Sequence, residues 1–395
     1  MTDYESLAVA WKTALIQELR GAGQLRRLLH AKPDLSGKET ATADLVASSI
    51  SQGTSFTAES IASTGRLVRV GPAAGPAIAL RAELDGLPIQ ELTEVDFASH
   101  NGNMHACGHD VHLAALAAVC RAARLVNLPF ALLAILQPRE EAPPSGARDI
   151  VRTGRLLSHD VRAIIAAHLQ PRVEAGTVAL DSDIVNAAHD EVRVVVYGHG
   201  GHGAYPHLSS NPVPAVCRIV LAFHELVRSS IDPMHPVVLT MTQLGGSGAA
   251  NVIPNTATAG GTLRTMVRSD LETIRPLMRR IGEQIADAHG CRCEVVHTEC
   301  EPVLVNDAGL VVQARRWFPT LGIEIAAPFR SCASDDFSWY GSAIPSIMMF
   351  VGTGDEDGAR TLHDPRFLPL DRRIGEVAHS LIAGYMGAAE QIGSC

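Results

Sequence analysis

The chain has 395 residues, 46% of them hydrophobic and 19% charged, and its formal net charge at pH 7 is −9. This length favours two domains, and this composition excludes a disordered or fibrous chain. The negative charge, the lack of basic blocks and the lack of apolar runs near the roughly 18 residues of a membrane span argue against nucleic-acid and membrane partners.

The N-terminal segment forms the first predicted elements, two helical pieces broken at Lys32-Pro33-Asp34. This N-terminus lacks a basic start followed by an apolar stretch and a cleavage site, so we expect a cytoplasmic protein. The eight cysteines show no framework spacing, and in that compartment we expect them to be reduced.

Short apolar runs alternate with a helical pattern through the next part of the chain. Residues 77–83, 131–136 and 162–168 predict buried strands, and residues 109–126 predict an Ala- and Leu-rich helix between the first two strands. Strand, helix and strand in this order indicate a mostly parallel sheet with helices on both faces.

A second kind of pattern begins near residue 185. Its predicted elements run strand, helix, strand, strand, helix, strand over 191–197, 211–228, 237–244, 257–267, 270–289 and 292–297. This is the order of a ferredoxin-like α+β unit. A helix from Asp307 and an apolar strand at 344–350 then return to the first pattern. We therefore predict a larger α/β domain of residues 1–184 and 300–395 that carries an inserted domain of residues 185–299.

The segment 105–112, His-Ala-Cys-Gly-His-Asp-Val-His, is dense in residues that bind metals. In an extended segment Cys107 and His109 would point to the same side and could bind one ion. Thiolate and imidazole are good ligands for zinc and related ions. A buried cysteine beside solvent-facing histidines is the structural alternative for one Cys-x-His pair, but three histidines and a cysteine so close together favour a metal site.

Two further signals follow predicted strands. Glu140 and Glu141 come shortly after the strand that ends at Leu136, and His168 ends the strand over Ala163–Ala167. Ligands of open α/β sheets bind at the carboxyl ends of strands. Adjacent residues diverge, so one Glu could bind metal while its neighbour faces the substrate as a general base. Taken alone, the two glutamates could be solvated surface residues and His168 could have a structural role. Their shared placement after strands favours a metal site.

Several ordered motifs now resemble one enzyme family. They are Arg81-Ala-Glu-Leu-Asp85-Gly-Leu-Pro88, His105-Ala-Cys-Gly-His-Asp110, Gln137-Pro-Arg-Glu-Glu141, Gly201-His-Gly-Ala-Tyr-Pro-His207, Asn251-Val-Ile-Pro254, Gly261-Thr-Leu-Arg264-Thr, Ser334-Asp-Asp-Phe337 and Leu362-His363. The chain resembles the dinuclear-metal amidohydrolases of the hippurate hydrolase, N-acyl-amino-acid amidohydrolase and auxin-conjugate hydrolase type, within the group that contains aminoacylase and carboxypeptidase G. The resemblance runs from about residue 25 to residue 385, and it implies a zinc-exopeptidase-like larger domain.

The resemblance implies two bound divalent metal ions with five ligands: Cys107, His109, Glu141, His168 and His363. It implies Glu140 as the general base. It also implies Asp85 and Asp110 as groups that orient the ligands. The thiolate favours zinc, manganese is the other main candidate, and cobalt and nickel also accept such ligands.

For the inserted domain, the resemblance implies a lid and a dimer contact. Asn251 and Arg264 would bind the carboxylate of the substrate, since the planar guanidinium matches a carboxylate with two parallel hydrogen bonds. A surface salt bridge is the alternative for Arg264. His202 would stabilise the oxyanion, in the wider group from the neighbouring subunit, so a homodimer is implied. Closure over the metals would require hinges near 185 and 299.

The implied reaction is hydrolysis of the amide bond of a small N-acyl or N-aroyl amino acid to a carboxylic acid and a free amino acid. A dipeptidase or an N-acetyl-diamino-acid deacetylase would use the same machinery. Two alternatives from other classes are a hydrolase with Cys107 as nucleophile and a metal-binding protein without activity, against which Glu140 argues.

Five positions depart from the family pattern: Glu83 for Asp, Val111 for Gly, Pro143 and Pro144 for glycines and Asp335 for Glu. None of them is an implied ligand. They therefore bear on the substrate rather than on the reaction, because the loop after Glu141 borders the cleft.

Overall fold

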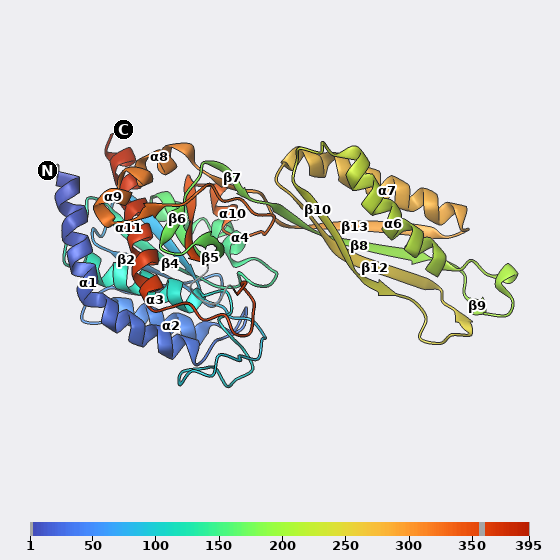
Figure 1. The fold of residues 1–395 in the computed structure, drawn as a ribbon, viewed down its shortest axis with the longest axis horizontal. Helices are drawn as coiled ribbons and strands as arrows, with labels where there is room; N and C mark the ends of the chain where they lie inside the picture. Colours follow the sequence, from blue (N-terminus) through green and yellow to red (C-terminus); the bar gives the residue numbers. More distant parts are fainter. Residues whose placement is uncertain (1–2, 355–359, 395) are drawn as a thin grey trace. The chain divides into compact units, whose positions relative to one another are not determined.

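A computed structural model describes residues 3–354 and 360–394 of the chain, which form two compact units (Figure 1). The main unit comprises the described part of residues 1–183, 305–329 and 336–395, and the inserted unit comprises residues 184–304 and 330–335. The short segment 330–335, which the sequence prediction left in the larger domain, packs with the inserted unit.

The main unit is built on one eight-stranded sheet of order β1-β2-β4-β3-β5-β16-β6-β15. Its strands are β1 Ala58–Ile61, β2 Gly65–Val70, β3 Ala77–Glu83, β4 Ala131–Gln137, β5 Val161–Glu174, β6 Thr177–Ala179, β15 Glu324–Ile325 and β16 Ser346–Gly354. The central strands β4, β3, β5 and β16 pair in parallel, and β1 and β2 add antiparallel strands at one edge. The predicted mostly parallel sheet is confirmed.

Helices cover both faces of this sheet, as expected. They are α1 Asp3–His30, α2 Thr40–Ser51, α3 His109–Ala123, α4 Gly146–Arg152, α5 Arg155–Ser158, α8 Ala308–Arg316, α9 Phe318–Leu321, α10 Ser338–Gly341 and α11 Arg372–Gly393. Alternate residues of a strand point to opposite faces. Leu80 and Ala82 of β3 therefore join the core under α1, α3 and α11, whereas Arg81 faces the segment that leads into α10, where it meets Asp336 at 3.0 Å.

The inserted unit is a four-stranded antiparallel sheet of order β10-β12-β8-β13 with two helices (Figure 1). Its elements are β8 Ala188–Tyr197, α6 Pro212–Ser230, β10 Val237–Gly245, β12 Thr256–Thr265, α7 Arg268–Ala288 and β13 Arg292–Glu301. Apolar residues of α6 and α7 form a single core with alternate residues of β8, such as Val192, Val194 and Val196. This is the predicted ferredoxin-like order of elements.

Short elements complete the chain. Two strands, β9 Gly201–His202 and β11 Val252–Ile253, form a small antiparallel sheet, and Pro206–Leu208 form a 3-10 helix. Strands β7 Asp183–Asn186 and β14 Leu304–Asn306 lie where the chain passes between the units. None of the described helices is both long and apolar enough to cross a membrane. The seven cysteines within the described residues form no disulfide; Cys395 lies outside those residues.

Candidate metal centre

The segment 105–108 places two of the predicted ligands by a turn rather than by an extended strand. Residues 106 and 107 lie in a turn, and α3 begins at His109. Gly108 has φ +86°, and a Cβ atom there would lie 2.8 Å from Leu169 Cδ1, so only glycine fits this close approach. The expectation of an extended Cys107–His109 segment was wrong. The turn nevertheless keeps Cys107 and His109 at the same edge of the sheet.

His109 presents one ring nitrogen to the centre. Its Nδ1 lies 2.8 Å from the backbone carbonyl of Asp85, which can only accept, so Nδ1 carries the proton. Its buried Nε2 has no hydrogen-bond partner among the described residues. That nitrogen lies 3.9 Å from Glu140 Oε2 and 4.0 Å from Glu141 Oε1. A lone pair is therefore directed at two carboxylates that are too distant for a hydrogen bond.

Cys107 and His168 form the second contact of the centre. His168 Nδ1 lies 2.7 Å from the carbonyl oxygen of Leu169, which fixes its proton there, and His168 Nε2 lies 3.5 Å from Cys107 Sγ. The expectation that His168 ends its strand was wrong, because β5 continues to Glu174. The pairing of β5 with β3 ends at Ala166, so His168 still lies level with the carboxyl end of β3.

His363 joins the centre from the C-terminal part of the chain. Its backbone N–H donates to Ala106 O at 2.9 Å, and its Nε2 lies 3.6 Å from Glu141 Oε1. It has φ +68°, a left-handed conformation that is uncommon and costly for a residue with a Cβ. Its side chain remains half exposed, so this part of the centre faces solvent.

The donor atoms fit metal ions. Cys107, Glu141 and His363 form one group whose ligand atoms lie within 4.8 Å of one another, and His109, Glu140 and Glu141 form a second. For tetrahedral zinc, sulfur and nitrogen ligands lie about 3.6 Å apart and nitrogen and oxygen ligands about 3.4 Å apart. The observed 3.5 Å between Cys107 and His168 and 3.6 Å between His363 and Glu141 match these values. Burial lowers the pKa of His109 and of His363, which keeps both imidazoles neutral and able to bind.

Asp85 positions the loop that carries the two glutamates. Its carboxylate accepts from the backbone N–H of Glu140 at 3.2 Å and of Glu141 at 2.9 Å, and from Ser36 Oγ at 2.6 Å. Burial raises the pKa of this carboxyl, and the hydrogen bonds oppose that effect. Through its own carbonyl it also holds His109. The structure thus places Asp85 behind three of the predicted site residues.

Asp110 holds the start of α3 against α1 rather than contacting a ligand ring. Its Oδ2 lies 3.0 Å from Arg26 Nε and 3.0 Å from His30 Nδ1. His30 also meets Glu91 at 2.9 Å. Burial alone would lower the pKa of His30, but Asp110 and Glu91 raise it to about 9. Burial would likewise raise the pKa of Asp110, but Arg26 and His30 hold it below its usual range.

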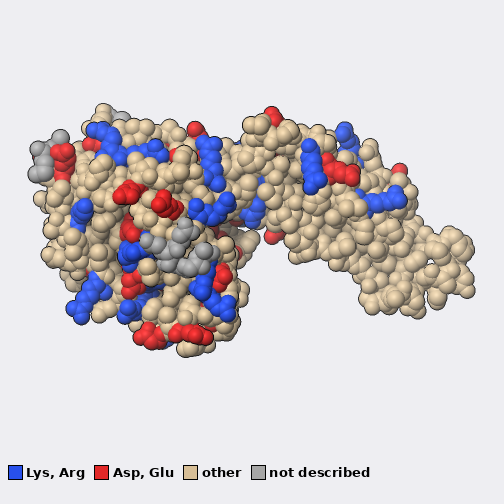
Figure 2. Space-filling model, viewed as in Figure 1, with Lys and Arg blue, Asp and Glu red and all other residues tan. Residues whose placement is uncertain are grey.

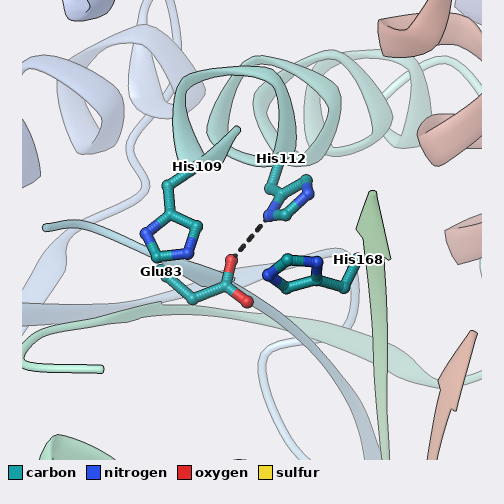
Figure 3. A group of neighbouring side chains, drawn as sticks. All are labelled: Glu83, His109, His112 and His168. Atoms are coloured by element: carbon teal, nitrogen blue, oxygen red, sulfur yellow. Dashed lines mark hydrogen bonds and ion pairs between the residues drawn. The ribbon is translucent and has the colours of Figure 1, made fainter. Parts of the chain in front are cut away.

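Two residues near the centre were not predicted as part of it. Glu83 and His112 lie with His109 and His168 in a buried group (Figure 3). Burial would raise the pKa of Glu83, but Arg81 and then His112 and His109 hold it well below its usual range. His112 is three residues after His109 in α3, and this spacing places both on one side of a helix. That spacing was the available signal.

The three predicted residues of the inserted unit lie in two places. His202 and Asn251 are neighbours, since β9 pairs with β11 and Gly203 N donates to Asn251 O at 2.8 Å. The exposed His202 accepts from Ala204 N at 3.0 Å through Nδ1, which leaves Nε2–H directed to solvent. Arg264 lies near the far end of β12, eight residues after Thr256, or roughly 26 Å along the strand.

Arg264 has neutral partners in the inserted unit. Its Nη1 donates to Ser334 Oγ at 3.1 Å and to Cys332 O at 3.4 Å. Within the described residues no carboxylate lies at ion-pair distance from it, so the surface salt bridge considered above is not formed. A half-buried guanidinium that has no carboxylate partner in the protein can bind the carboxylate of a ligand.

Known proteins resemble this chain along most of its length. The model of peptidase family M20/M25/M40 matches residues 79–382. The N-acetyl-L-cysteine deacetylase of Bacillus subtilis is 33% identical over 87% of this chain and 82% of its own length. The IAA-amino acid hydrolase ILR1-like 5 of Arabidopsis thaliana is 33% identical over 91% of this chain and 84% of its own length.

Further relatives point the same way. The N-acetyldiaminopimelate deacetylase of Shouchella clausii is 30% identical over 91% of this chain and 96% of its own length. Among solved structures, the YXEP protein of Bacillus subtilis, a dinuclear metal-binding peptidase from the M20 family, superposes with a TM-score of 0.79 at 28% identity. That superposition covers 98% of this chain and 99% of the YXEP chain.

Proposed function

The chain belongs to peptidase family M20/M25/M40 and is a hydrolase of that family, and we propose that it cleaves the amide bond of N-acyl or N-aroyl amino acids. One observation carries this proposal. The buried His109 Nε2, without a hydrogen-bond partner in the described residues, faces Glu140 and Glu141 at the edge of the main sheet. The relatives named for N-acetyl and IAA conjugates support amide substrates of this class.

The centre would hold two divalent ions through Cys107, His109, Glu141, His168 and His363. Zinc or manganese suits this donor set best, with cobalt and nickel as alternatives. Glu141 belongs to both groups of close ligand atoms, which supports a pair of ions rather than one. When bound, such ions polarise the amide carbonyl and make water acidic enough to attack at neutral pH.

Glu140 is the base in this proposal. Its side chain is only 11% exposed, and its backbone is held by Asp85. The carboxylate takes a proton from the attacking water and then gives it to the departing nitrogen, so that the amino group leaves as a neutral amine rather than as an amide anion. Glu141 is the less suitable base, because it lies against His363 and Cys107.

Replacing Cys107 tests the ligand set. Cys107→Ser exchanges a thiolate for a hydroxyl that remains protonated near neutral pH, so we expect weaker metal binding with an unchanged fold. Metal content after dialysis against a graded series of chelators measures this, with Cys120→Ser as control, because Cys120 is buried in α3 away from the centre. Two ions per chain held as tightly as in the parent would show that Cys107 is not a ligand.

Arg264 is proposed to bind the α-carboxylate of the substrate. Arg264→Ala is therefore expected to raise KM strongly for substrates with a free carboxylate and to change KM little for the matching carboxamides. Steady-state kinetics on each acid and amide pair measures the difference. Equal losses on both kinds of substrate would contradict the carboxylate role.

The separation within the inserted unit supports a homodimer. Arg264 lies roughly 26 Å along β12 from Thr256, and the pair His202 and Asn251 lies beyond the Thr256 end of that strand, too far to contact one small substrate together with Arg264 of the same chain. If all three act on substrate, His202 and Asn251 serve the centre of a partner subunit. The free Nε2–H of His202 would there donate to the oxyanion.

The edge of the inserted sheet offers the surface for such a dimer. Edge strand β10 contains no charged residue and no proline, whereas the opposite edge, β13, carries Arg292, Glu294, Glu299 and Glu301. Unprotected edge strands tend to pair with another chain. The end of this unit around β9 shows no Lys, Arg, Asp or Glu on the face drawn in Figure 2.

Mixing two inactive variants tests whether His202 acts across the dimer. Glu140→Gln chains keep His202, and His202→Ala chains keep Glu140. Mixed dimers then contain one centre with both groups, so partial activity is expected after subunit exchange. Mixtures that stay as inactive as the two separate variants would contradict a role for His202 in the partner's site.

A further inference from the structure

His112 lies beside the proposed ligands without being placed to bind an ion. It is buried in α3, and its two ring nitrogens have partners in the main unit. Nδ1 lies 2.9 Å from Glu83 Oε2, the contact drawn in Figure 3, and Nε2 lies 3.0 Å from the backbone nitrogen of Leu169.

The partners fix the protonation of this ring. The backbone N–H of Leu169 can only donate, so Nε2 of His112 accepts and carries no proton. The remaining proton of the neutral ring is therefore on Nδ1, where it donates to the carboxylate of Glu83. Both nitrogens are engaged, so neither lone pair is available to a metal ion. Glu83 is engaged as well, between His112 and Arg81.

These contacts reach both histidines that the proposed function assigns to metal. The backbone N–H of Leu169 donates to His112, and the backbone carbonyl of the same residue accepts from His168 Nδ1 at 2.7 Å. His109 is one helical turn before His112 in α3. The chain Glu83, His112, Leu169 backbone therefore links β3, α3 and β5 at the level of the centre.

We propose that His112 is a positioning residue that, backed by Glu83, sets the orientation of His168 and its spacing from His109. This inference rests on the proposed metal function. Hydrogen-bonded groups behind metal ligands commonly change metal affinity about 10- to 100-fold when they are replaced. The same order of effect is expected here, since the ring of His168 is held by the backbone carbonyl of Leu169 and by Cys107 and packs edge-on against the ring of His112.

Three substitutions separate the two contacts. His112→Phe keeps an aromatic ring and removes both hydrogen bonds. His112→Gln places an oxygen the same number of bonds from Cα as Nε2, so it can still accept from Leu169. His112→Asn places its amide N–H at the position of Nδ1, so it can still donate to Glu83. His379→Phe is the matched control, a histidine of α11 in the same unit.

The experiment measures the metal dissociation constant of each full-length variant by competition with a chromophoric chelator, and the urea unfolding of each metal-free protein. His112→Phe is expected to weaken metal binding about 10- to 100-fold, and His112→Gln to recover much of the loss, more than His112→Asn. His379→Phe is expected to bind metal like the parent. Should His112→Phe not fold, the order of the Gln and Asn variants decides.

Metal binding by His112→Phe equal to that of the parent would overturn the inference, as would a Gln variant that binds no better than the Asn variant. Losses of metal affinity that only follow the loss of stability in the metal-free proteins would also overturn it. Failure of the proposed function looks different, because the parent itself would then bind no stoichiometric metal.

Discussion

Glu140→Gln is expected to lower turnover by roughly 10²- to 10⁴-fold while metal content and unfolding stay as in the parent. The glutamine keeps the size and the backbone contact of Glu140 to Asp85 but cannot accept a proton from water. The neighbouring Glu141→Gln is the matched comparison. Since Glu141 lies against His363 and Cys107, that variant is expected to lose metal as well as activity.

Metal analysis and turnover measured on the same preparations separate the two glutamates. Turnover of Glu140→Gln within tenfold of the parent would show that another group is the base. Loss of metal from both variants to the same degree would show that Glu140 is itself a ligand, as its distance of 3.9 Å from His109 Nε2 would allow.

Arg26→Met is expected to lower the free energy of unfolding by about 3–5 kcal/mol, because it removes one partner of a buried ion pair. Arg26 and Asp110 are each 1% exposed, and the contact joins α1 to the first turn of α3. Arg162→Met is the control, since its pair with Asp160 is largely exposed and such pairs contribute at most about 1 kcal/mol. Urea unfolding of the two variants gives the comparison.

The stability contributed by the ionised Asp110 and His30 falls at low pH and at high pH. The pKa of Asp110 is lowered on folding from 3.8, so its contribution is present above that value and is lost on further acidification. The pKa of His30 is raised from 6.5 to about 9, so its contribution is full below 6.5 and disappears as the pH rises through 9. The difference in unfolding free energy between the parent and His30→Phe, which lacks the ionised imidazole, should therefore be largest between pH 4 and 6.5. A difference that does not change from pH 5 to pH 10 would contradict this account.

Much of the fold could be predicted from local patterns. The run Ala77–Glu83 is β3 as predicted, and the helix expected from residue 109 begins at His109. Strand β2 was missed because Arg66 and Arg69 interrupt its apolar residues Leu67, Val68 and Val70, so the sequence shows neither a continuous apolar run nor a regular alternation. The segment 330–335 was misplaced because its packing with the inserted unit is tertiary and leaves no local signal.

The candidate metal centre, like the fold, could be predicted only where the signal lies in the local sequence. Cys107, His109, Glu140 and Glu141 stood out because they are adjacent in sequence and follow a turn or a strand. Glu83 and His112 also lie in the quoted motifs but were not assigned to the site, because their role depends on a contact between β3, α3 and β5. For Asn251 and Arg264, a shared role on one substrate was expected, but the placement of Asn251 beyond the start of β12 and of Arg264 near its end emerges only once the strand bounds and register are known.

Restoring activity to metal-stripped protein tests the central claim most directly. The protein is treated with a chelator, dialysed, and assayed on N-acetyl, N-benzoyl and N-succinyl amino acids with and without added zinc or manganese. We expect no hydrolysis of any substrate by the stripped protein, and recovery of amide cleavage as two ions per chain are restored. Undiminished hydrolysis by stripped protein, abolished instead by alkylation of Cys107, would contradict the metal mechanism and identify a thiol hydrolase.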